Sequence, residues 1–212
     1  MNQKDVSIDD IEVIIVNTKK ESLNLGTFGE NVHLIEAYLD CERVIGRNLG
    51  MRKAIGDWIC WLDSDDEYTS NYFSKLNQAM EEYSEAVCFN FGALVHWHGL
   101  KSTVRQTFKP QELGSDSFKG MEFKSGRIAT GSFVFKRSLL NEIGYLQESV
   151  HPYGDSESFS GKSKNPNYLG DEFLNFPPMG NPWGCDYQMF YQITRKYDSQ
   201  PLDLVLYLQN VR

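Results

Sequence analysis

The chain has 212 residues, of which 41% are hydrophobic and 13% aromatic, so it can bury a core and is most simply one domain over residues 1–212. Its formal charge of -8 excludes a basic nucleic-acid-binding surface, because no run of Lys or Arg is longer than Lys19-Lys20. The four cysteines lie far apart without a CxxC pair, which indicates reduced thiols and neither a zinc site nor a disulfide framework. A polar N-terminus and the lack of a long apolar run predict a cytoplasmic chain without a transmembrane segment, and a location peripheral to a membrane stays open.

Apolar runs and stretches with helical spacing alternate along the chain. Strands are predicted at Ile11–Val16, Val32–Tyr38, Trp58–Leu62, Ala86–Trp97, Ile128–Phe135 and Leu202–Leu208. Helices are predicted at Arg43–Ile55 with Gly56 as C-cap, after a cap at Thr69 or Ser70 with an apolar stripe from Tyr72 to Tyr83, at Ser138–Ile143 and at Pro182–Tyr197. This alternation predicts an α/β fold with a mixed, mostly parallel sheet flanked by helices.

Residues 151–183 differ from the rest of the chain. They are rich in Gly, Pro, Asn, Ser and aromatic residues and show no periodicity. A connection of this length inside a compact domain is usually a functional lid or a disordered segment, and the interleaved aromatic residues favour a loop that folds over a bound molecule.

The strand predicted at Trp58–Leu62 runs directly into Asp63-Ser64-Asp65-Asp66. Carboxylates this close together repel and raise one another's pKa unless a cation lies among them. Hard oxygen ligands suit Mg²⁺ or Mn²⁺ that bridges substrate phosphates. The alternative is a solvated turn that caps the following helix and binds no cation.

Two other cation-binding patterns fit this cluster poorly. A calcium-binding EF-hand loop needs Gly at its sixth position and Glu at its twelfth, where this chain has Tyr68 and Ser74. A haloacid-dehalogenase-like phosphotransferase needs Thr or Val where Glu67 stands. His96 and His98 share one face of a predicted strand, but without a third ligand at a fixed spacing we expect exposed or hydrogen-bonded histidines.

With its upstream segment, the acidic cluster resembles a known family. The stretch RNLGMRKAIGDWICWLDSDDEYTSNYF, residues 47–73, resembles the block of family 2 glycosyltransferases in which an Arg-Asn-x-Gly helix start precedes Ala-x-Gly, a hydrophobic strand and Asp-x-Asp. Residues 130–148 and 181–197 resemble two further blocks of that family, in the expected order. The resemblance covers most of the chain from Ile11 onward and implies a GT-A-like, Rossmann-like fold.

The resemblance also implies a donor site. Asp63 and Asp65 would hold Mn²⁺ or Mg²⁺ against the diphosphate of a UDP-like nucleotide sugar, with Asp66 beside the nucleotide. Arg47 would contact the base or the phosphates, although its position also suits an ordinary surface residue. Asn17 stands where the family has a uracil-contacting Asp, and its amide can donate and accept but carries no charge.

On the acceptor side, Asp186 matches the family's general base, which deprotonates the attacking hydroxyl in inverting members. The same carboxylate could simply complement the dipole of its helix, and the two roles are compatible. Trp183 and Gly184 would line the acceptor site next to the loop of residues 151–183, or Trp183 could anchor that loop in the core.

The implied activity is metal-dependent transfer of a sugar, with inversion, to a glycan, lipid-linked or protein hydroxyl. A homo-oligomer stays open. The alternative is a non-catalytic GT-A-like module that binds a sugar nucleotide or a partner, because the family's first strand-helix unit is not found before Ile11 and the C-terminal end offers only Asn210 to complete a cation's ligands.

Overall fold

The structure is a computed structural model that describes residues 6–18, 21–24, 26, 29–37, 43–97, 103–105, 131–146, 185–194 and 196–211. The side chains of residues 8, 43, 97, 103–105, 185–188, 191 and 211 are not described. The chain divides into two compact units. The first contains Met1–Ser7, Trp58–Lys136 and Ile193–Arg212, and the second contains Ile8–Asp57 and Arg137–Gln192. The predicted loop of residues 151–183 lies outside the described residues.

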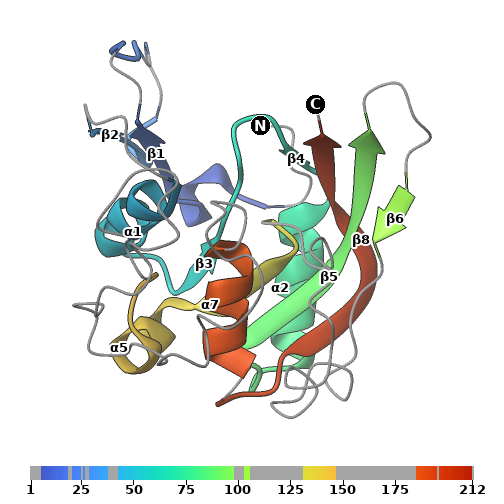
Figure 1. Ribbon diagram of the computed structural model, residues 1–212. Coiled ribbons are helices and arrows are strands. Elements are labelled where there is room, and N and C mark those ends of the chain that lie inside the picture. The colour runs from blue at the N-terminus through green and yellow to red at the C-terminus, as the bar shows by residue number, and fades with distance from the viewer. Residues whose placement is uncertain are drawn as a thin grey trace, which may run out of the picture. The chain divides into compact units, whose positions relative to one another are not determined.

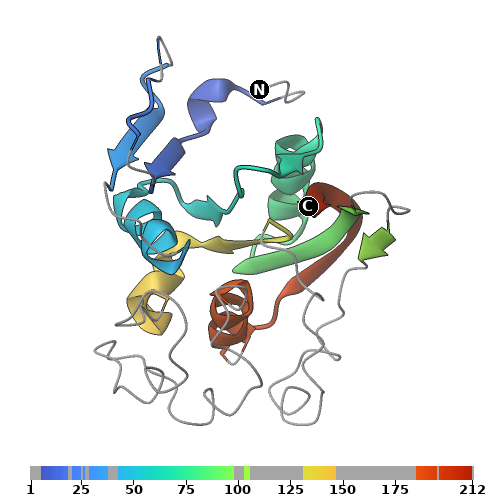
Figure 2. The same ribbon diagram turned by 45° about the horizontal axis from the view of Figure 1, so that its top comes forward.

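A six-stranded sheet forms the first unit, in the order β3-β7-β5-β8-β4 with β6 beside β5. Its strands are β3 (Trp58–Cys60), β4 (Glu67–Tyr68), β5 (Cys88–Trp97), β6 (Thr103–Arg105), β7 (Phe133–Lys136) and β8 (Gln200–Val211). The long strands β5 and β8 lie side by side and are parallel (Figures 1 and 2). The β3–β7, β5–β7, β5–β6 and β4–β8 pairs are antiparallel.

Helix α2 (Tyr72–Glu82) packs on this sheet through its buried residues Tyr72, Leu76 and Ala79. These side chains form one core with residues of β5, β7 and β8, namely Phe89, Phe91, Ala93, Val134, Leu202, Leu206 and Tyr207. The 3.6-residue spacing of the stripe explains this burial. The stripe ends earlier than predicted, because Tyr83 follows the helix and is 37% exposed.

The second unit contains a two-stranded parallel sheet, β1 (Val13–Asn17) and β2 (Val32–Glu36). Its helical elements are η1 (Ile8–Asp10), α1 (Arg43–Lys53), η2 (Arg137–Leu139), α5 (Leu140–Ile143) and most of α7 (Cys185–Thr194). Helix α1 packs closely on β1, since a Cβ at Gly46 would lie 3.3 Å from Thr18 Cγ2 and one at Gly50 would lie 3.6 Å from Val16 Cγ2.

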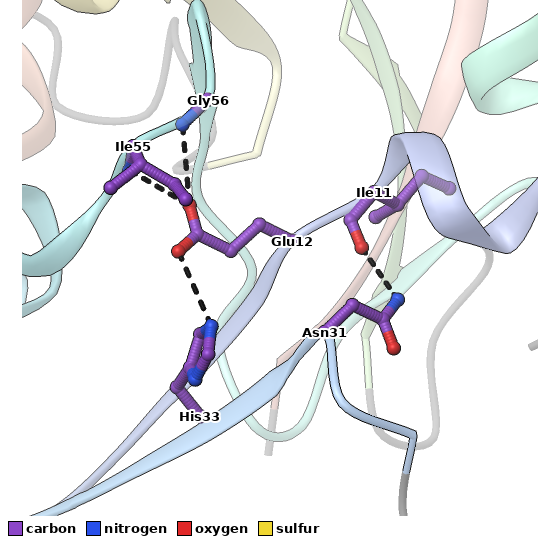
Figure 3. Close-up of polar contacts among 6 residues, drawn as sticks. All are labelled: Ile11, Glu12, Asn31, His33, Ile55 and Gly56. Atoms are coloured by element: carbon purple, nitrogen blue, oxygen red, sulfur yellow. Dashed lines mark hydrogen bonds and ion pairs between the residues drawn. The ribbon is translucent and has the colours of Figure 1, made fainter.

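The predicted C-cap at Gly56 is wrong. Helix α1 ends at Lys53, and Ile55 is 74% exposed, so it is not part of an apolar helical stripe. The N–H groups of Ile55 and Gly56 instead donate to Glu12 Oε2, at 2.9 and 3.3 Å, while Glu12 Oε1 lies 3.6 Å from His33 Nε2 (Figure 3). The Glu12 carboxylate therefore fixes the chain after the helix. The spacing of residues within the helix cannot reveal this partner, because Glu12 lies on a distant segment.

Other predicted boundaries also differ. Asn71 precedes α2 and makes no side-chain cap bond, so neither Thr69 nor Ser70 is the N-cap. Strand β3 ends at Cys60 because its partner β7 pairs only with Trp58–Cys60, and Leu62 is 49% exposed.

The mixed α/β class is confirmed. The two longest ladders, β1–β2 and β5–β8, are parallel, but the shorter antiparallel ladders are more numerous than a mostly parallel sheet implies.

Two cysteines are described as free thiols. Burial raises the pKa of Cys60 to about 11 and that of Cys88 to about 12, so both are protonated at neutral pH. Cys41 lies outside the described residues, as does the side chain of Cys185. Among the helices of the described part, none has the length and apolar character to cross a bilayer.

Candidate functional site

The acidic residues lie on a turn that follows β3. The N–H of Asp66 donates to the carbonyl of Asp63 at 3.1 Å and closes the turn. The three carboxylates are in different environments, since Asp65 is exposed, Asp63 is partly buried and Asp66 is only 8% exposed. The turn therefore buries the carboxylate of Asp66 and leaves that of Asp65 at the surface.

Strand β8 holds the buried acid. The Tyr207 hydroxyl donates to Asp66 Oδ2, and the N–H of Asn210 donates to Oδ1 at 2.8 Å. Burial raises the pKa of Asp66, an effect that these two hydrogen bonds oppose. Burial and the bond to Asp66 raise the pKa of Tyr207, so its hydroxyl stays protonated and remains the donor.

Further contacts fix the backbone on both sides of the turn. Asn210 Nδ2 donates to the carbonyl of Asp65 at 2.6 Å, and the Tyr68 hydroxyl donates to the carbonyl of Trp61 at 2.7 Å. The ring of Tyr68 stacks on Tyr72 with centroids 3.7 Å apart. Because aromatic residues and β8 hold the backbone on both sides of the turn, the positions of Asp63 and Asp65 are fixed by contacts outside the turn.

The donor atoms at the turn suit a hard cation only in part. Oxygen ligands of carboxylates are the type that Mg²⁺ and Mn²⁺ prefer. Both oxygens of Asp66 already accept hydrogen bonds from the protein, so a cation bound by Asp66 would have to replace or share one of these partners. Within the described ranges, no group of three or more His, Cys, Asp or Glu side chains could hold a metal ion.

In the second unit, Asn17 lies at the carboxyl end of β1 and is 5% exposed. Its Nδ2 donates to the Glu21 carbonyl and to Glu36 Oε2, both at 2.7 Å. Glu36 Oε1 also accepts the N–H of Leu23 at 3.0 Å, so this carboxylate holds both the last residue of β1 and the loop that follows it.

Sequence reasoning missed Glu36 as a residue of this region. The signal was present, because parallel strands end at the same edge and Glu36 ends β2 as Asn17 ends β1; the two are register partners. Asn17 is thus an amide held by an adjacent carboxylate.

Two neighbouring residues of the Arg-Asn-x-Gly segment lie on α1 and differ in role. Asn48 is 1% exposed and exchanges two hydrogen bonds with the backbone of Leu146, at 2.8 and 3.0 Å. It holds α1 to the segment after α5. Arg47 is partly buried, and a guanidinium in that setting can still offer a fork to phosphate or to a base edge.

The predicted site residues therefore fall into three groups. Asp63, Asp65 and Asp66 form one turn of the first unit. Asn17 and Arg47 belong to the second unit, as does Asp186 on α7, whose side chain is outside the description. The predicted acceptor residues Trp183 and Gly184 lie outside the described residues altogether.

The sequence profile of glycosyl transferase family 2 matches residues 2–144. The chain belongs to this family. This family 2 chain is also similar to the uncharacterized glycosyltransferase YwdF of Bacillus subtilis (strain 168). The two sequences are 26% identical over 158 residues, an alignment that covers 73% of this chain and 58% of YwdF.

Solved structures similar to this family 2 chain include TarS of S. aureus. Residues 1–349 of TarS give a TM-score of 0.55 at 11% identity, covering 99% of this chain and 53% of that one. The same TarS fragment in complex with UDP-GlcNAc gives a TM-score of 0.51 at 13% identity, covering 100% of this chain and 52% of that one. The family 2 chain thus has the GT-A-like fold of TarS and spans about half the length of that fragment.

Proposed function

We propose that this chain is a metal-dependent glycosyltransferase that moves a sugar from a UDP-like donor, with inversion, to a hydroxyl of a glycan, a lipid-linked molecule or a protein. The observation that carries the proposal is the turn that presents Asp63 and Asp65 in a family 2 chain. The UDP-GlcNAc complex of TarS, which has the same fold, supports the choice of donor class.

Asp63 and Asp65 would hold Mn²⁺ or Mg²⁺ on the donor diphosphate. Two carboxylates are enough for such a role, because Mg²⁺ is usually bound by one or two carboxylates together with substrate phosphates and water. When bound, the cation would stabilise the charge that builds on the leaving diphosphate. Asp66 would contribute to the nucleotide site mainly by fixing this turn, since a direct bond to the ribose would replace one of its protein partners.

Asn17 and Arg47 would bind the nucleotide. Both N–H groups of the Asn17 amide donate to Glu36 and to the Glu21 carbonyl, so its oxygen would be the atom that accepts a hydrogen bond from a base edge. Arg47 would neutralise phosphate charge. Asp186 would take the proton of the acceptor hydroxyl as its oxygen attacks the anomeric carbon and the bond to the diphosphate breaks. Trp183 and Gly184 would line the acceptor side.

Donor turnover tests the proposal directly. Purified protein is incubated with UDP-GlcNAc, UDP-glucose and UDP-galactose, with Mn²⁺, Mg²⁺ or EDTA, and released UDP is measured alongside the melting temperature. We expect UDP release with at least one donor, its loss in EDTA, and a higher melting temperature with UDP and Mn²⁺. No release with any donor and an unchanged melting temperature would refute the proposal.

Asp186→Asn tests the general base. The isosteric amide cannot accept the proton, so we expect transfer to fall about a hundredfold, at the low end for a general base, with the Kd for UDP unchanged. Initial rates at saturating donor and acceptor, together with calorimetric UDP binding, provide the measurement. Full turnover in the variant would assign proton transfer to another group.

A second candidate is a non-catalytic module that binds the nucleotide sugar. The observation that favours it is that Asp66, one of the three acids of the turn, has both of its oxygens bonded to the protein. A melting temperature that rises with UDP and Mn²⁺ while no donor is turned over would favour this module over the enzyme.

A further inference from the structure

The carboxylate of Asp66 is the least exposed of the acidic turn, and its two oxygens have separate protein partners on β8, the Tyr207 hydroxyl and the Asn210 N–H. A carboxylate is costly to bury unless hydrogen bonds replace its water. Bonds to an ionised acceptor are also stronger than those between neutral groups. Asp66 is therefore strongly tied to β8.

The same strand controls the backbone of the turn. The main-chain N–H of Asn210 donates to the Asp66 carboxylate, and its side-chain amide donates to the Asp65 carbonyl. Asn210 therefore bonds to two successive residues of the turn. Strand β4, directly after the turn, pairs with β8 through Glu67 opposite Leu208 and Tyr68 opposite Tyr207. A shift of β8, or of Asn210 on it, would therefore also shift the turn that carries Asp63 and Asp65.

Tyr207 cannot easily adjust its position. It has no exposed surface, and its ring lies so close to Gly131 that a Cβ there would be 2.0 Å from Cε2. Its hydroxyl is consequently delivered to Asp66 from a fixed ring. Removal of a group that orients a metal ligand directly lowers metal affinity about 10- to 100-fold. Tyr207 would act one step further away, through Asp66 and the backbone of the turn, so an effect at the low end of that range follows.

We propose that Tyr207 and Asn210 are positioning residues that use Asp66 as an internal anchor, so that Asp63 and Asp65 face the cation and the donor diphosphate in one geometry. This inference rests on the proposed function. In it, Asp66 acts through its hydrogen bonds and is not itself a ligand of the cation.

Binding of Mn²⁺ tests the assignment without relying on turnover. The free Mn²⁺ signal in electron paramagnetic resonance is titrated with wild type and Tyr207→Phe, each with and without UDP, well below both melting temperatures. Phe keeps the ring in place and removes only the hydroxyl. We expect the Kd for Mn²⁺ in the presence of UDP to rise about tenfold in the variant.

Tyr83→Phe is the control. It also removes one tyrosine hydroxyl from the first unit, but Tyr83 follows helix α2, is 37% exposed and takes no part in the contacts described for the turn. We expect wild-type Mn²⁺ affinity. A lower melting temperature for Tyr207→Phe with unchanged Mn²⁺ affinity would show a purely structural role and overturn the inference.

Asp66→Asn separates an anchor from a ligand. The amide oxygen can accept the Asn210 N–H and the amide nitrogen can donate to the Tyr207 oxygen, so the geometry is retained while the charge is lost. We expect Mn²⁺ affinity within about fivefold of wild type, since only a nearby charge is removed. A loss on the order of a hundredfold, equal to that of Asp63→Asn, would make Asp66 a ligand and refute its role as anchor.

The outcomes also separate this inference from the function on which it rests. Wild type that binds neither Mn²⁺ nor UDP refutes the proposed function and this inference with it. Wild type that binds both, with Tyr207→Phe indistinguishable from it, leaves the glycosyltransferase proposal standing and overturns only the positioning roles.

Discussion

Replacement of both Asp63 and Asp65 by Asn is expected to lower the rate of sugar transfer about a thousandfold, because it removes the carboxylates that would hold the cation on the leaving diphosphate. The folded state should be nearly unaffected. Asp65 is exposed, and the buried anchor of the turn is Asp66, which the double variant retains. Asp63 is partly buried, but Asn keeps the size of Asp and one acceptor oxygen, so we expect a change in stability of about 1 kcal/mol or less, or about 2–4 °C in melting temperature for a chain of this size.

The measurement is UDP release at saturating Mn²⁺ together with a thermal melt. Asp198→Asn with Asp203→Asn is the matched control, because it removes two exposed carboxylates from the same unit without touching the turn. We expect wild-type transfer from this control. If both double variants lose transfer equally, the effect is one of overall charge and the turn has no special role.

Gly131→Ala is expected to destabilise the protein by about 3 kcal/mol, the upper end for overpacking of a core. A Cβ at Gly131 would lie 2.0 Å from Cε2, 2.4 Å from Cδ2 and 2.7 Å from Cζ of Tyr207. Such separations require a shift of the ring, and the ring is fully buried with its hydroxyl bonded to Asp66. The variant should therefore also disturb the acidic turn.

Gly50→Ala provides the contrast. Its Cβ would lie 3.6 Å from Val16 Cγ2, an ordinary contact, and it stands inside helix α1. Ala is the better helix former, so we expect a gain of roughly 0.5–1 kcal/mol. Urea unfolding of both variants measures the two changes, and a Gly131→Ala protein as stable as wild type would show that the ring has room to move.

The sequence was sufficient for the parts of the fold that depend on local patterns. The β-branched run of β1, the apolar stripe of α2 and the position of the acidic turn all follow from neighbours in the sequence. Strand partners were not predictable in this way, because pairing joins distant segments; β8 lies between β5 and β4, and nothing in its own residues specifies that order.

The same distinction applies within the candidate site. The spacing of Asp63, Asp65 and Asp66 does not reveal how deeply each carboxylate is buried, whereas the structure buries Asp66 and leaves Asp65 exposed. The cause is a pair of partners, Tyr207 and Asn210, that lie 141 and 144 residues further along the chain. The sequence indicates Asn210 as an oxygen ligand for a cation near the C-terminal end, but spacing does not reveal its hydrogen bonds to the turn.

Strand β8 also determines when the acidic turn can form during synthesis. Its partners in the sheet and in the turn were made more than a hundred residues earlier, so these contacts close late and slow folding. A nascent chain that has not yet emerged from the ribosome as far as Asn210 carries all three aspartates but neither hydrogen bond that orients Asp66. In the cell, the arrangement of these carboxylates would be set by a strand that emerges more than a hundred residues later, rather than by the segment that contains them.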